Sequence, residues 1–343
     1  MKPIKFPRDE QNHQCSIEWW YWNGHLQDEK GNRYAFMDCL FQVNPKKAKI
    51  PLLQIPLERF YFSHSILSDI KKQKFYPHVD YASWLSSDSF KRPLLFVNYV
   101  DPSFFNGYTV SVMEKTAPSQ YHIKTANFDL RLISQKKPLL EGENGYVDIG
   151  RHSTYYYSLT ALKTSGTIRI GKKEIAVTGL SWMDHQWSNT VYVNDEWNWF
   201  SIQLKNNIEI ICFEYRGEEN KTSLASISYA DARTENFFDV RFTPLSEEWI
   251  SPRTRARYPL SWRIEIPEKK IDLIVKPLLK KQEVIFGTIN YWEGPFKVAG
   301  TMAGKKVTGQ GFLELVGRAS KYKAGKFFRE AFEQALKSIK NRK

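Results

Sequence analysis

The stretch Thr178–Ser188, TGLSWMDHQWS, places an acid beside an imidazole in a strand-like apolar run. Asp184 and His185 are bracketed by Trp182 and Trp187. A carboxyl group among apolar side chains has its pKa raised by desolvation, so it can stay protonated near neutral pH and donate a proton. Aromatic faces stabilise a developing cation. Carboxyl, imidazole and indole groups in one block therefore suit an acid–base centre in an apolar pocket.

A strand would separate these groups, because successive side chains point to opposite faces. Asp184 would share a face with Trp182, and His185 would share the other face with Trp187. We expect His185 and Trp187 to face a ligand and Asp184 to be braced by other groups, unless a bulge intervenes. The alternative is that Asp184 and His185 are structural and pin a strand across a junction between domains.

Glu214 is a second candidate acid. A hairpin around the turn KNN would pair Asn198 with Glu214, which places Glu214 at the far end of an apolar face. There it is either an acid with a raised pKa or a rim residue paired with Arg216 or Lys205.

Three more side chains could line the same cavity. Glu18, in EWWY, shares a face with Trp20 and is either an acid in an aromatic cavity or the acceptor for a buried indole N–H. His64, in YFSHSILSD, alternates with apolar residues and is expected to point inward, as a core residue or as part of the site. Tyr156, within YYY, could supply a phenol or simply pack.

Composition indicates a globular protein with a high aromatic content. Hydrophobic residues make up 42% and charged residues 25% of the 343, while aromatic residues make up 15%. Such aromatic content suits wide β surfaces and apolar ligand cavities. The net charge is +13, but residues 320–343 hold eight basic and two acidic residues. The rest of the chain therefore has only a small positive net charge for its size. We therefore expect no nucleic-acid partner.

Compartment signals are few. The three cysteines are an odd number, which excludes a complete disulfide framework and indicates reduced thiols. The first residues form no apolar signal-peptide core, and no apolar run reaches the ~18–20 residues of a membrane span. The expected location is cytoplasmic or membrane-peripheral, or exported if a signal peptide has been removed.

The hydrophobic pattern alternates with a period of two and is interrupted by short polar turns, which predicts an all-β fold. A partial repeat relates SGTIRIGKKEIAVTGLSWM (165–183) to AGTMAGKKVTGQGFLEL (299–315), and EWWY (18–21) to EWNWF (196–200). Two β units explain both echoes. We expect domains at 1–180 and 181–318, with WMDHQW at their junction, where ligand sites are common.

Residues 319–343 have the pattern of a basic amphipathic helix. Such a helix could lie on an anionic membrane surface or pack on the barrel with its charges in water.

The chain contains, in this order, the blocks FPRDEQNHQCSIEWWYWNGHL, YFSHSILSD, YYYSLTALKTSGTI, GLSWMDHQWS and YWEGPFKVAGTMAGKKVTGQGFLELVG. They run from about Phe6 to about Gly317 and resemble the lipocalin-like carotenoid 1,2-hydratase (hydroxyneurosporene synthase) superfamily. That superfamily also contains fungal lipocalin-like cyclases and proteins described as predicted secreted hydrolases.

The resemblance implies two packed lipocalin-like antiparallel β-barrels and cofactor-free chemistry on an apolar polyene or terpenoid-like substrate. It also implies catalytic roles for Asp184, His185 and Trp187. An acidic and an aromatic residue further downstream matter in the hydratases. Their nearest counterparts are Glu214 and Tyr215, although the spacing and residue types differ. Cyclisation, isomerisation or hydrolysis on the same scaffold stays open.

Other catalytic signatures are missing from the sequence. It has no nucleophile elbow, zinc-protease helix, phosphate loop or dinucleotide fingerprint. Its histidines and cysteines show no metal-ligand spacing. The sequence therefore predicts a cofactor-independent, metal-free hydratase or related lyase that acts on a lipophilic small molecule. The alternative is a non-catalytic carrier of lipophilic ligands.

Overall fold

The computed structural model describes residues 2–48, 59–80, 83–85, 94–103, 107–142, 144–149, 152–190, 195–217, 221–286 and 289–319. The tail predicted as a basic helix lies outside these ranges, except for its first residue. No helix in the described part is both long and apolar enough to cross a membrane.

The first sheet is antiparallel and has 13 strands, in the order β4-β3-β2-β1-β13-β12-β9-β8-β7-β6-β5, with β10 and β11 also paired to β12. Its strands are β1 (Ile17–Gln27), β2 (Arg33–Val43), β3 (Phe60–Asp69), β4 (Lys74–Asp80), β5 (Trp84–Leu85), β6 (Phe96–Ser103), β7 (Gly107–Ala117), β8 (Gln120–Lys124), β9 (Phe128–Ser134), β10 (Leu139–Leu140), β11 (Tyr146–Ile149), β12 (His152–Ile170) and β13 (Lys173–Ser188).

The second sheet has 10 strands, in the order β17-β16-β15-β14-β25-β24-β22-β21-β18, with β23 paired to β24. Its strands are β14 (Glu196–Leu204), β15 (Ile208–Arg216), β16 (Lys221–Ser228), β17 (Thr234–Phe237), β18 (Arg241–Pro244), β21 (Trp262–Ile266), β22 (Ile271–Pro277), β23 (Glu283–Phe286), β24 (Ile289–Met302) and β25 (Lys305–Val316). The remaining elements are the hairpin β19 (Glu248–Ile250) with β20 (Arg257–Pro259), and the short helices η1 (Arg8–Glu10), α1 (Pro45–Ala48) and η2 (Pro267–Lys269).

The two halves of the sequence repeat occupy equivalent places in the two sheets. β12 and β13 form one long hairpin, β24 and β25 form the other, and each turns beside a Gly–Lys–Lys. β13 then pairs with Trp-rich β1, and β25 pairs with Trp-rich β14. A Cβ at Gly179 would lie 2.0 Å from the carbonyl oxygen of His25, and one at Gly309 would lie 2.3 Å from that of Gln203. The repeated glycines therefore allow the partner strand to approach closely.

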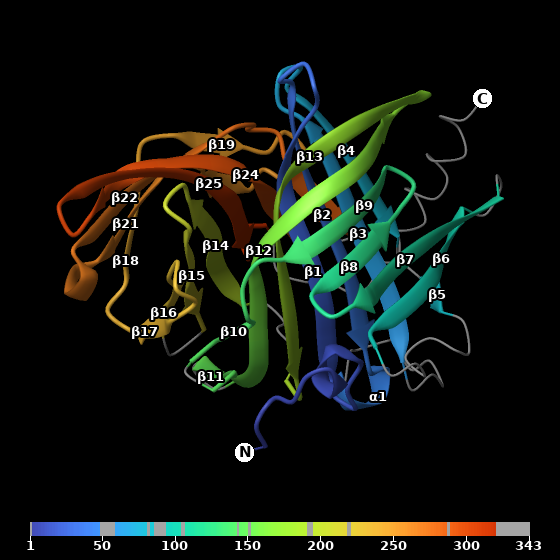
Figure 1. Cartoon of the computed structure of the whole chain (residues 1–343), viewed down its shortest axis with the longest axis horizontal. Helices are drawn as coiled ribbons and strands as arrows, with labels where there is room; N and C mark the ends of the chain where they lie inside the picture. Colours follow the sequence, from blue (N-terminus) through green and yellow to red (C-terminus); the bar gives the residue numbers. More distant parts are fainter. Residues whose placement is uncertain are drawn as a thin grey trace.

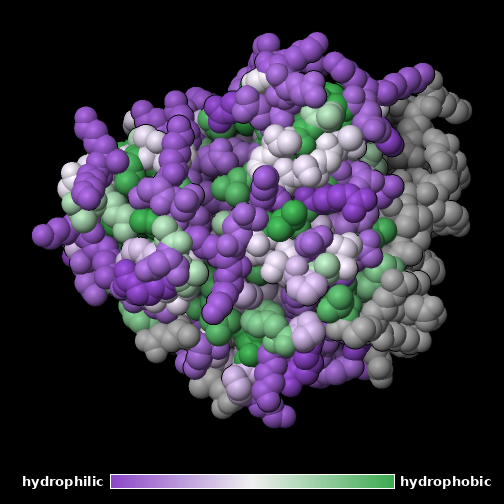
Figure 2. Space-filling view, in the orientation of Figure 1, coloured by the Kyte–Doolittle hydropathy of each residue, from purple (hydrophilic) through white to green (hydrophobic). Residues whose placement is uncertain are grey.

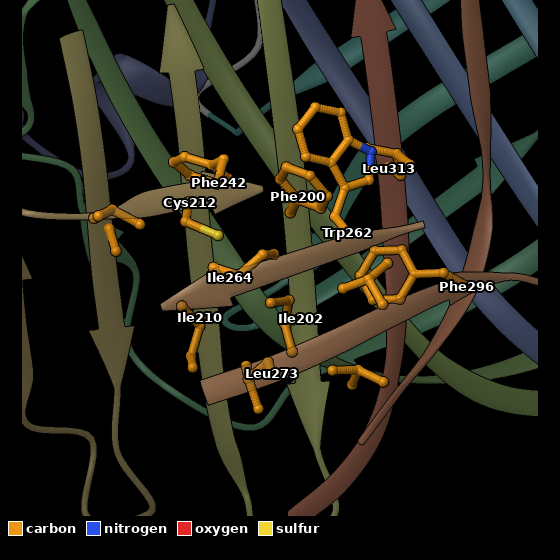
Figure 3. Close-up of a cluster of buried hydrophobic side chains, with 14 of the residues drawn as sticks. Phe200, Ile202, Ile210, Cys212, Phe242, Trp262, Ile264, Leu273, Phe296 and Leu313 are labelled. Atoms are coloured by element: carbon orange, nitrogen blue, oxygen red, sulfur yellow. The ribbon is translucent and has the colours of Figure 1, made fainter. Parts of the chain in front are cut away.

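Each sheet curves around its own apolar cluster, and a third cluster lies between the sheets. Trp20, Phe36 and Met183 belong to the cluster inside the first sheet. The cluster inside the second sheet draws side chains from most of its strands (Figure 3). The third cluster joins Trp182 of the first sheet to Trp199 of the second, among others. We call this layer the junction. All-β lipocalin-like architecture is thus confirmed.

The sheets stand side by side (Figure 1) and meet where β1 and β12 contact β25, β14 and β15. β13 ends at Ser188 and β14 begins at Glu196, so the chain passes between the sheets within this interval. The domain boundary expected after residue 180 falls inside β13, because β13 stays paired with β1 as far as Ser188. The outer face in Figure 2 is mainly hydrophilic, with apolar side chains in small scattered groups.

Candidate active site

The two faces of β13 lead to two different environments. His185 and Trp187 point into the cluster inside the first sheet, while Asp184 and Trp182 point into the junction. The pairing of β1 with β13 runs from Ser188 to Thr178 in one register, without a bulge. The strand alternation expected for this block is therefore what separates the aspartate from the histidine.

Asp184 is fully hydrogen-bonded within the junction. Its Oδ1 accepts hydrogen bonds from Ser158 Oγ and Trp182 Nε1, both at 2.6 Å, and its Oδ2 accepts one from Tyr156 OH at 2.5 Å. The indole of Trp199, on the second sheet, donates to the same Tyr156 hydroxyl at 2.9 Å. Burial raises the pKa of Asp184 to about 7, although these hydrogen bonds oppose the shift. Asp184 thus connects the sheets through Tyr156.

A carboxyl pair lies beside Asp184 in the junction. Glu293 on β24 and Glu314 on β25 are cross-strand partners, and their carboxyl groups are hydrogen-bonded to each other. Tyr21 OH, from the first sheet, donates to Glu293 Oε1 at 2.8 Å, and the indole of Trp197 donates to Glu314. Burial raises the pKa of both carboxyls, and the charge of Glu314 raises that of Glu293 further. Because two touching carboxyls in a largely apolar layer resist double ionisation, the pair retains a proton.

A neutral imidazole lies in the same layer. Burial lowers the pKa of His64 to about 3. Its Nδ1 lies 2.7 Å from Tyr291 OH, and its Nε2 has no hydrogen-bond partner among the described residues. The rings of Phe41, Phe62 and Phe286 surround it, with centroids 4.8–5.6 Å away. A neutral imidazole with an open nitrogen can accept a proton from water.

The interior of the first sheet holds a second polar group, which we call the imidazole centre and which consists of His13, Glu18 and His185. Glu18 Oε1 accepts hydrogen bonds from His13 Nδ1 at 2.6 Å and from His185 Nε2 at 2.9 Å. Burial alone would raise the pKa of Glu18, but the two imidazoles outweigh burial and lower it. Burial lowers the pKa of His185, which Glu18 only partly offsets. The donor atoms of the three residues lie within 4.8 Å of one another, close enough to share a metal ion.

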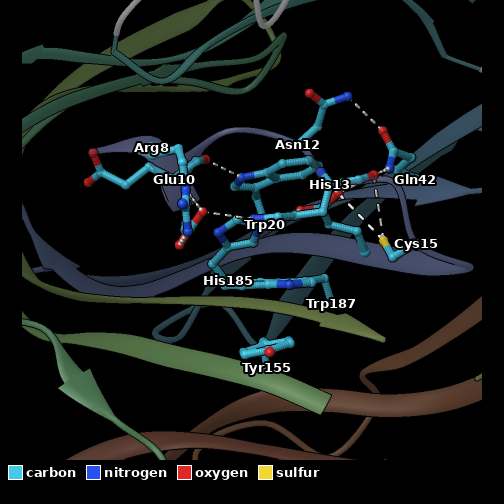
Figure 4. A network of polar contacts seen from close by, with 12 residues as sticks. Arg8, Glu10, Asn12, His13, Cys15, Trp20, Gln42, Tyr155, His185 and Trp187 are labelled. Carbon is cyan, nitrogen blue, oxygen red and sulfur yellow. Dashed lines mark hydrogen bonds and ion pairs between the residues drawn. The ribbon is translucent and has the colours of Figure 1, made fainter. Parts of the chain in front are cut away.

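Aromatic rings enclose the imidazole centre (Figure 4). Trp20 stacks on His185 and Trp187 stacks on His13, with centroids 4.8 Å and 3.9 Å apart. A pocket of about 450 Å³ lies nearby and is lined in part by Phe6, Glu10, Lys115, Tyr121 and Leu159. The Glu10 carboxylate accepts hydrogen bonds from both Lys115 and Tyr121, at 2.8 Å.

The expected site residues therefore fall into two groups and one outlier. The junction holds Asp184, Tyr156, His64 and Tyr215, while the first sheet encloses Glu18, Trp20, His185 and Trp187. The outlier, Glu214, pairs with Asn198 in the β14–β15 register, as the KNN hairpin predicts. It forms ion pairs with Arg216 and Lys221 and contacts neither group in the described part of the chain.

Family membership follows from the comparison of the sequence with protein-family models. The model of the AttH-like family matches residues 1–318. The chain belongs to the AttH-like family. This agrees with the carotenoid hydratase-like resemblance.

AttH-like relatives include two fungal enzymes. The dehydratase asqC of Emericella nidulans is 25% identical over 228 residues, 62% of each chain. The kievitone hydratase of Fusarium solani subsp. phaseoli is 25% identical over 210 residues, 56% of this chain and 57% of that enzyme. The match thus spans about three fifths of the length of these curated relatives.

Solved structures share the AttH-like fold over nearly the whole chain. A crystal structure of an AttH protein from Nitrosomonas europaea has a TM-score of 0.74 and 26% identity, covering 93% of this chain and 98% of that one. The kievitone hydratase from Nectria haematococca has a TM-score of 0.72 and 18% identity, covering 93% and 94%. The second likeness concerns the fold alone.

Sequence reasoning missed the carboxyl pair of this AttH-like protein. Glu293 and Glu314 lie in two blocks that carry the family resemblance, YWEGPF and GFLELVG, and each glutamate interrupts an apolar strand. That interruption is the available signal, because burying an ionisable group is costly. The sequence did not show that Tyr21 and Trp197 would meet these acids.

Proposed function

We propose that this AttH-like protein is a cofactor-independent hydro-lyase that adds water to, or removes it from, a carbon–carbon bond of an apolar isoprenoid- or polyene-like molecule at the junction. The carboxyl pair Glu293–Glu314 carries the proposal, because it keeps a proton inside an aromatic layer and acts on Tyr291, the hydrogen-bond partner of the neutral His64 of the other sheet. A hydratase and a dehydratase among the relatives support the reaction class.

The chemistry favours the junction over the pocket beside the imidazole centre. Protonating an alkene requires an acid that still carries its proton near neutral pH, in apolar surroundings. The junction offers carboxyls with raised pKa values, whereas Glu18 has a lowered pKa and is therefore ionised. Glu10, in the pocket wall, forms an ion pair with Lys115, which balances its charge.

Hydration would proceed in two steps. One carboxyl of the pair donates its proton to an alkene carbon, and the π electrons form the new C–H bond. The adjacent carbon becomes cationic, and the faces of Trp197 and Tyr21 stabilise it by up to about 2 kcal/mol each. Water attacks this carbon, forms the C–O bond and passes a proton to His64 Nε2. Dehydration reverses these steps.

Tyr291 offers a return path for the proton. Its hydroxyl is hydrogen-bonded to His64 Nδ1, and burial, followed by the charges of Glu293 and Glu314, raises its pKa. A phenol that stays protonated between an imidazole and a carboxyl pair can relay a proton without ionising itself. The acid is thereby reset after each turnover.

The test is conversion of acyclic isoprenoids in ¹⁸O-labelled water, followed by mass spectrometry. We expect wild type to incorporate one ¹⁸O, and Glu293→Gln and Glu314→Gln to lose roughly 10²–10⁴-fold in kcat, the usual worth of a positioned acid. His64→Gln should cause a loss within the same range.

Glu283→Gln is the matched control. Glu283 is also a buried glutamate of the second sheet, but Ser251, Thr254 and Tyr258 bind it away from the junction. Its variant should retain turnover within a few-fold. Full activity in Glu293→Gln, or an equal loss in Glu283→Gln, contradicts the proposal. Saturable binding without product indicates a carrier, and product without ¹⁸O indicates an isomerase or cyclase.

A further inference from the structure

The imidazole centre has the donor set of a transition-metal site. Two imidazole nitrogens and one carboxylate oxygen converge within 4.8 Å. Glu18 and His185 are fully buried, and the side chain of His13 is 21% exposed. Nitrogen and carboxylate ligands of this kind suit Zn²⁺ and Co²⁺, whereas Mg²⁺ and Ca²⁺ prefer oxygen alone.

Outer partners hold the far side of each donor group. His185 Nδ1 lies 3.3 Å from Tyr157 OH, and His13 Nε2 lies 3.4 Å from Asp9 Oδ1. Glu18 Oε2 accepts hydrogen bonds from Gln42 Nε2 at 3.0 Å and from the backbone N–H of His13 at 2.8 Å. Histidines that bind metals characteristically donate their other ring N–H to such partners, which fixes the tautomer.

Stacking also fixes the planes of both imidazoles. The His13 ring lies 5° from parallel to Trp187, and the His185 ring lies 23° from parallel to Trp20. Figure 4 shows His13, Trp187 and Tyr155 layered on one another above β12. Such walls oppose rotation of the rings away from Glu18, so the donor atoms are preorganised.

From this geometry we propose that His13, Glu18 and His185 bind one divalent transition-metal ion, with zinc as the natural occupant. Tetrahedral Zn²⁺ with Zn–N distances of about 2.0–2.1 Å places its ligand atoms about 3.3 Å apart. Glu18 Oε1 must therefore move away from the two imidazole nitrogens, which lie 2.6 Å and 2.9 Å from it. On binding, the proton of each imidazole moves from the metal-binding nitrogen to the other ring nitrogen. From there the His185 ring donates a hydrogen bond to Tyr157 OH and the His13 ring donates one to Asp9. The protons therefore balance without a co-reactant.

The ion would act as a clip. His13 precedes β1, whereas Glu18 lies on β1 and His185 on β13, so one ion would fasten the N-terminal segment to two neighbouring strands. Because His185 and Asp184 point to opposite faces of β13, the clip is separate from the junction and does not depend on the proposed reaction. A ligand that binds only the folded chain raises its thermal stability.

The test uses untagged, full-length protein freed of metal by a chelator. We expect Co²⁺ titration to give one saturable d–d absorption spectrum per chain, and Zn²⁺ to raise Tm. His13→Gln should weaken Co²⁺ binding by at least 100-fold, and Asp9→Asn by about 10-fold, as loss of an outer partner usually does.

His122→Gln is the matched control, because His122 also sits between two carboxylates, Glu114 and Asp129, but these bind opposite nitrogens of its ring and are partly exposed. Its Co²⁺ affinity should equal that of wild type. The proposal is overturned if wild type shows no saturable uptake, if His13→Gln binds as tightly as wild type, or if His122→Gln weakens binding equally. Should circular dichroism show His13→Gln unfolded, unchanged affinity in Asp9→Asn overturns the proposal instead.

Discussion

At the scale of single residues, the junction and the imidazole centre differ in their protonation states. The carboxyls of the junction have raised pKa values because burial and mutual repulsion are not offset by cations. Glu18 is equally buried but bound by two imidazoles, which lower its pKa. Neighbours, rather than burial alone, decide which acid is neutral.

Tyr156 has a role that can be measured separately from turnover. It donates to Asp184 and accepts from Trp199, so Tyr156→Phe removes the hydrogen-bond partner of two buried atoms, Asp184 Oδ2 and Trp199 Nε1. We expect a loss of about 1–3 kcal/mol in the free energy of unfolding, measured with urea.

Tyr155→Phe is the comparison variant. The neighbouring Tyr155 hydroxyl accepts a long hydrogen bond, 3.3 Å, from the exposed backbone of Lys2. Its removal should change stability by less than about 0.5 kcal/mol. If both variants lose the same free energy of unfolding, the hydrogen bonds through Tyr156 do not contribute specifically to stability.

At the scale of elements, the long hairpins β12–β13 and β24–β25 position both centres. β13 is buried on both faces along Ser181–Ser188, so its alternate side chains serve different layers. β25 and β24 bring Glu314 and Glu293 together because these residues are opposite each other in the ladder. A slip of one residue would turn every side chain to the other face.

The repeated glycines protect this register. In Gly179→Ala the new methyl would lie 2.0 Å from the carbonyl oxygen of His25, which forces β1 and β13 apart. We expect a loss of more than about 2 kcal/mol in thermal or urea unfolding, the range of overpacked sites. Thr178→Ala, at the exposed adjacent position, should stay within about 0.5 kcal/mol of wild type. Comparable losses in the two variants would exclude the close approach as the cause.

At the scale of the whole molecule, the proposed active site exists only because the two sheets dock. Three of its polar contacts take one partner from each sheet: Tyr21 with Glu293, His64 with Tyr291, and Tyr156 with Trp199. A further cross-sheet contact joins His25 Nε2 to the carbonyl oxygen of Gly311 at 2.9 Å. Separating the sheets would expose these groups to water and return their pKa values toward normal.

Docking should therefore respond to pH through Glu141, whose pKa burial raises to about 8 from 4.5. The folded chain then binds a proton that the unfolded chain loses between these two pKa values, so stability falls as pH rises from about 4.5 to about 8. Glu141→Gln should remove the part of this slope that Glu141 contributes and add ~3–5 kcal/mol at pH 8.5.

Urea unfolding from pH 5 to pH 9 measures the effect. The exposed Glu174→Gln should retain the wild-type slope, because the side chain of Glu174 is 57% exposed. If the free energy of unfolding of Glu141→Gln falls with pH as steeply as that of wild type, the pH response belongs to other groups.

Much of the fold was predictable from local pattern. Period-two alternation and short turns predicted the β hairpins, and the KNN turn predicted that Asn198 pairs with Glu214. The GKK echo predicted two related units, and the two repeats form equivalent hairpins whose turn glycines, Gly171 and Gly304, both have positive φ. The same alternation predicted that the side chains of Asp184 and His185 would point to opposite faces of the strand.

The site was predictable only in pieces. His64, Tyr156 and Asp184 were identified as candidates, but not that they would meet Glu293 and Glu314 across a junction. Likewise, histidine and cysteine spacing gave no sign of the proposed metal site, since strand pairing brings His185 to Glu18 and the segment before β1 supplies His13.

The chain by itself determined the strands, their turns and the faces on which each side chain would lie, because these depend on neighbours a few residues away. Tertiary structure alone decided which faces meet, and therefore which acids keep a proton. A pKa in a buried layer depends on groups that the opposite sheet supplies, and those groups are distant in sequence.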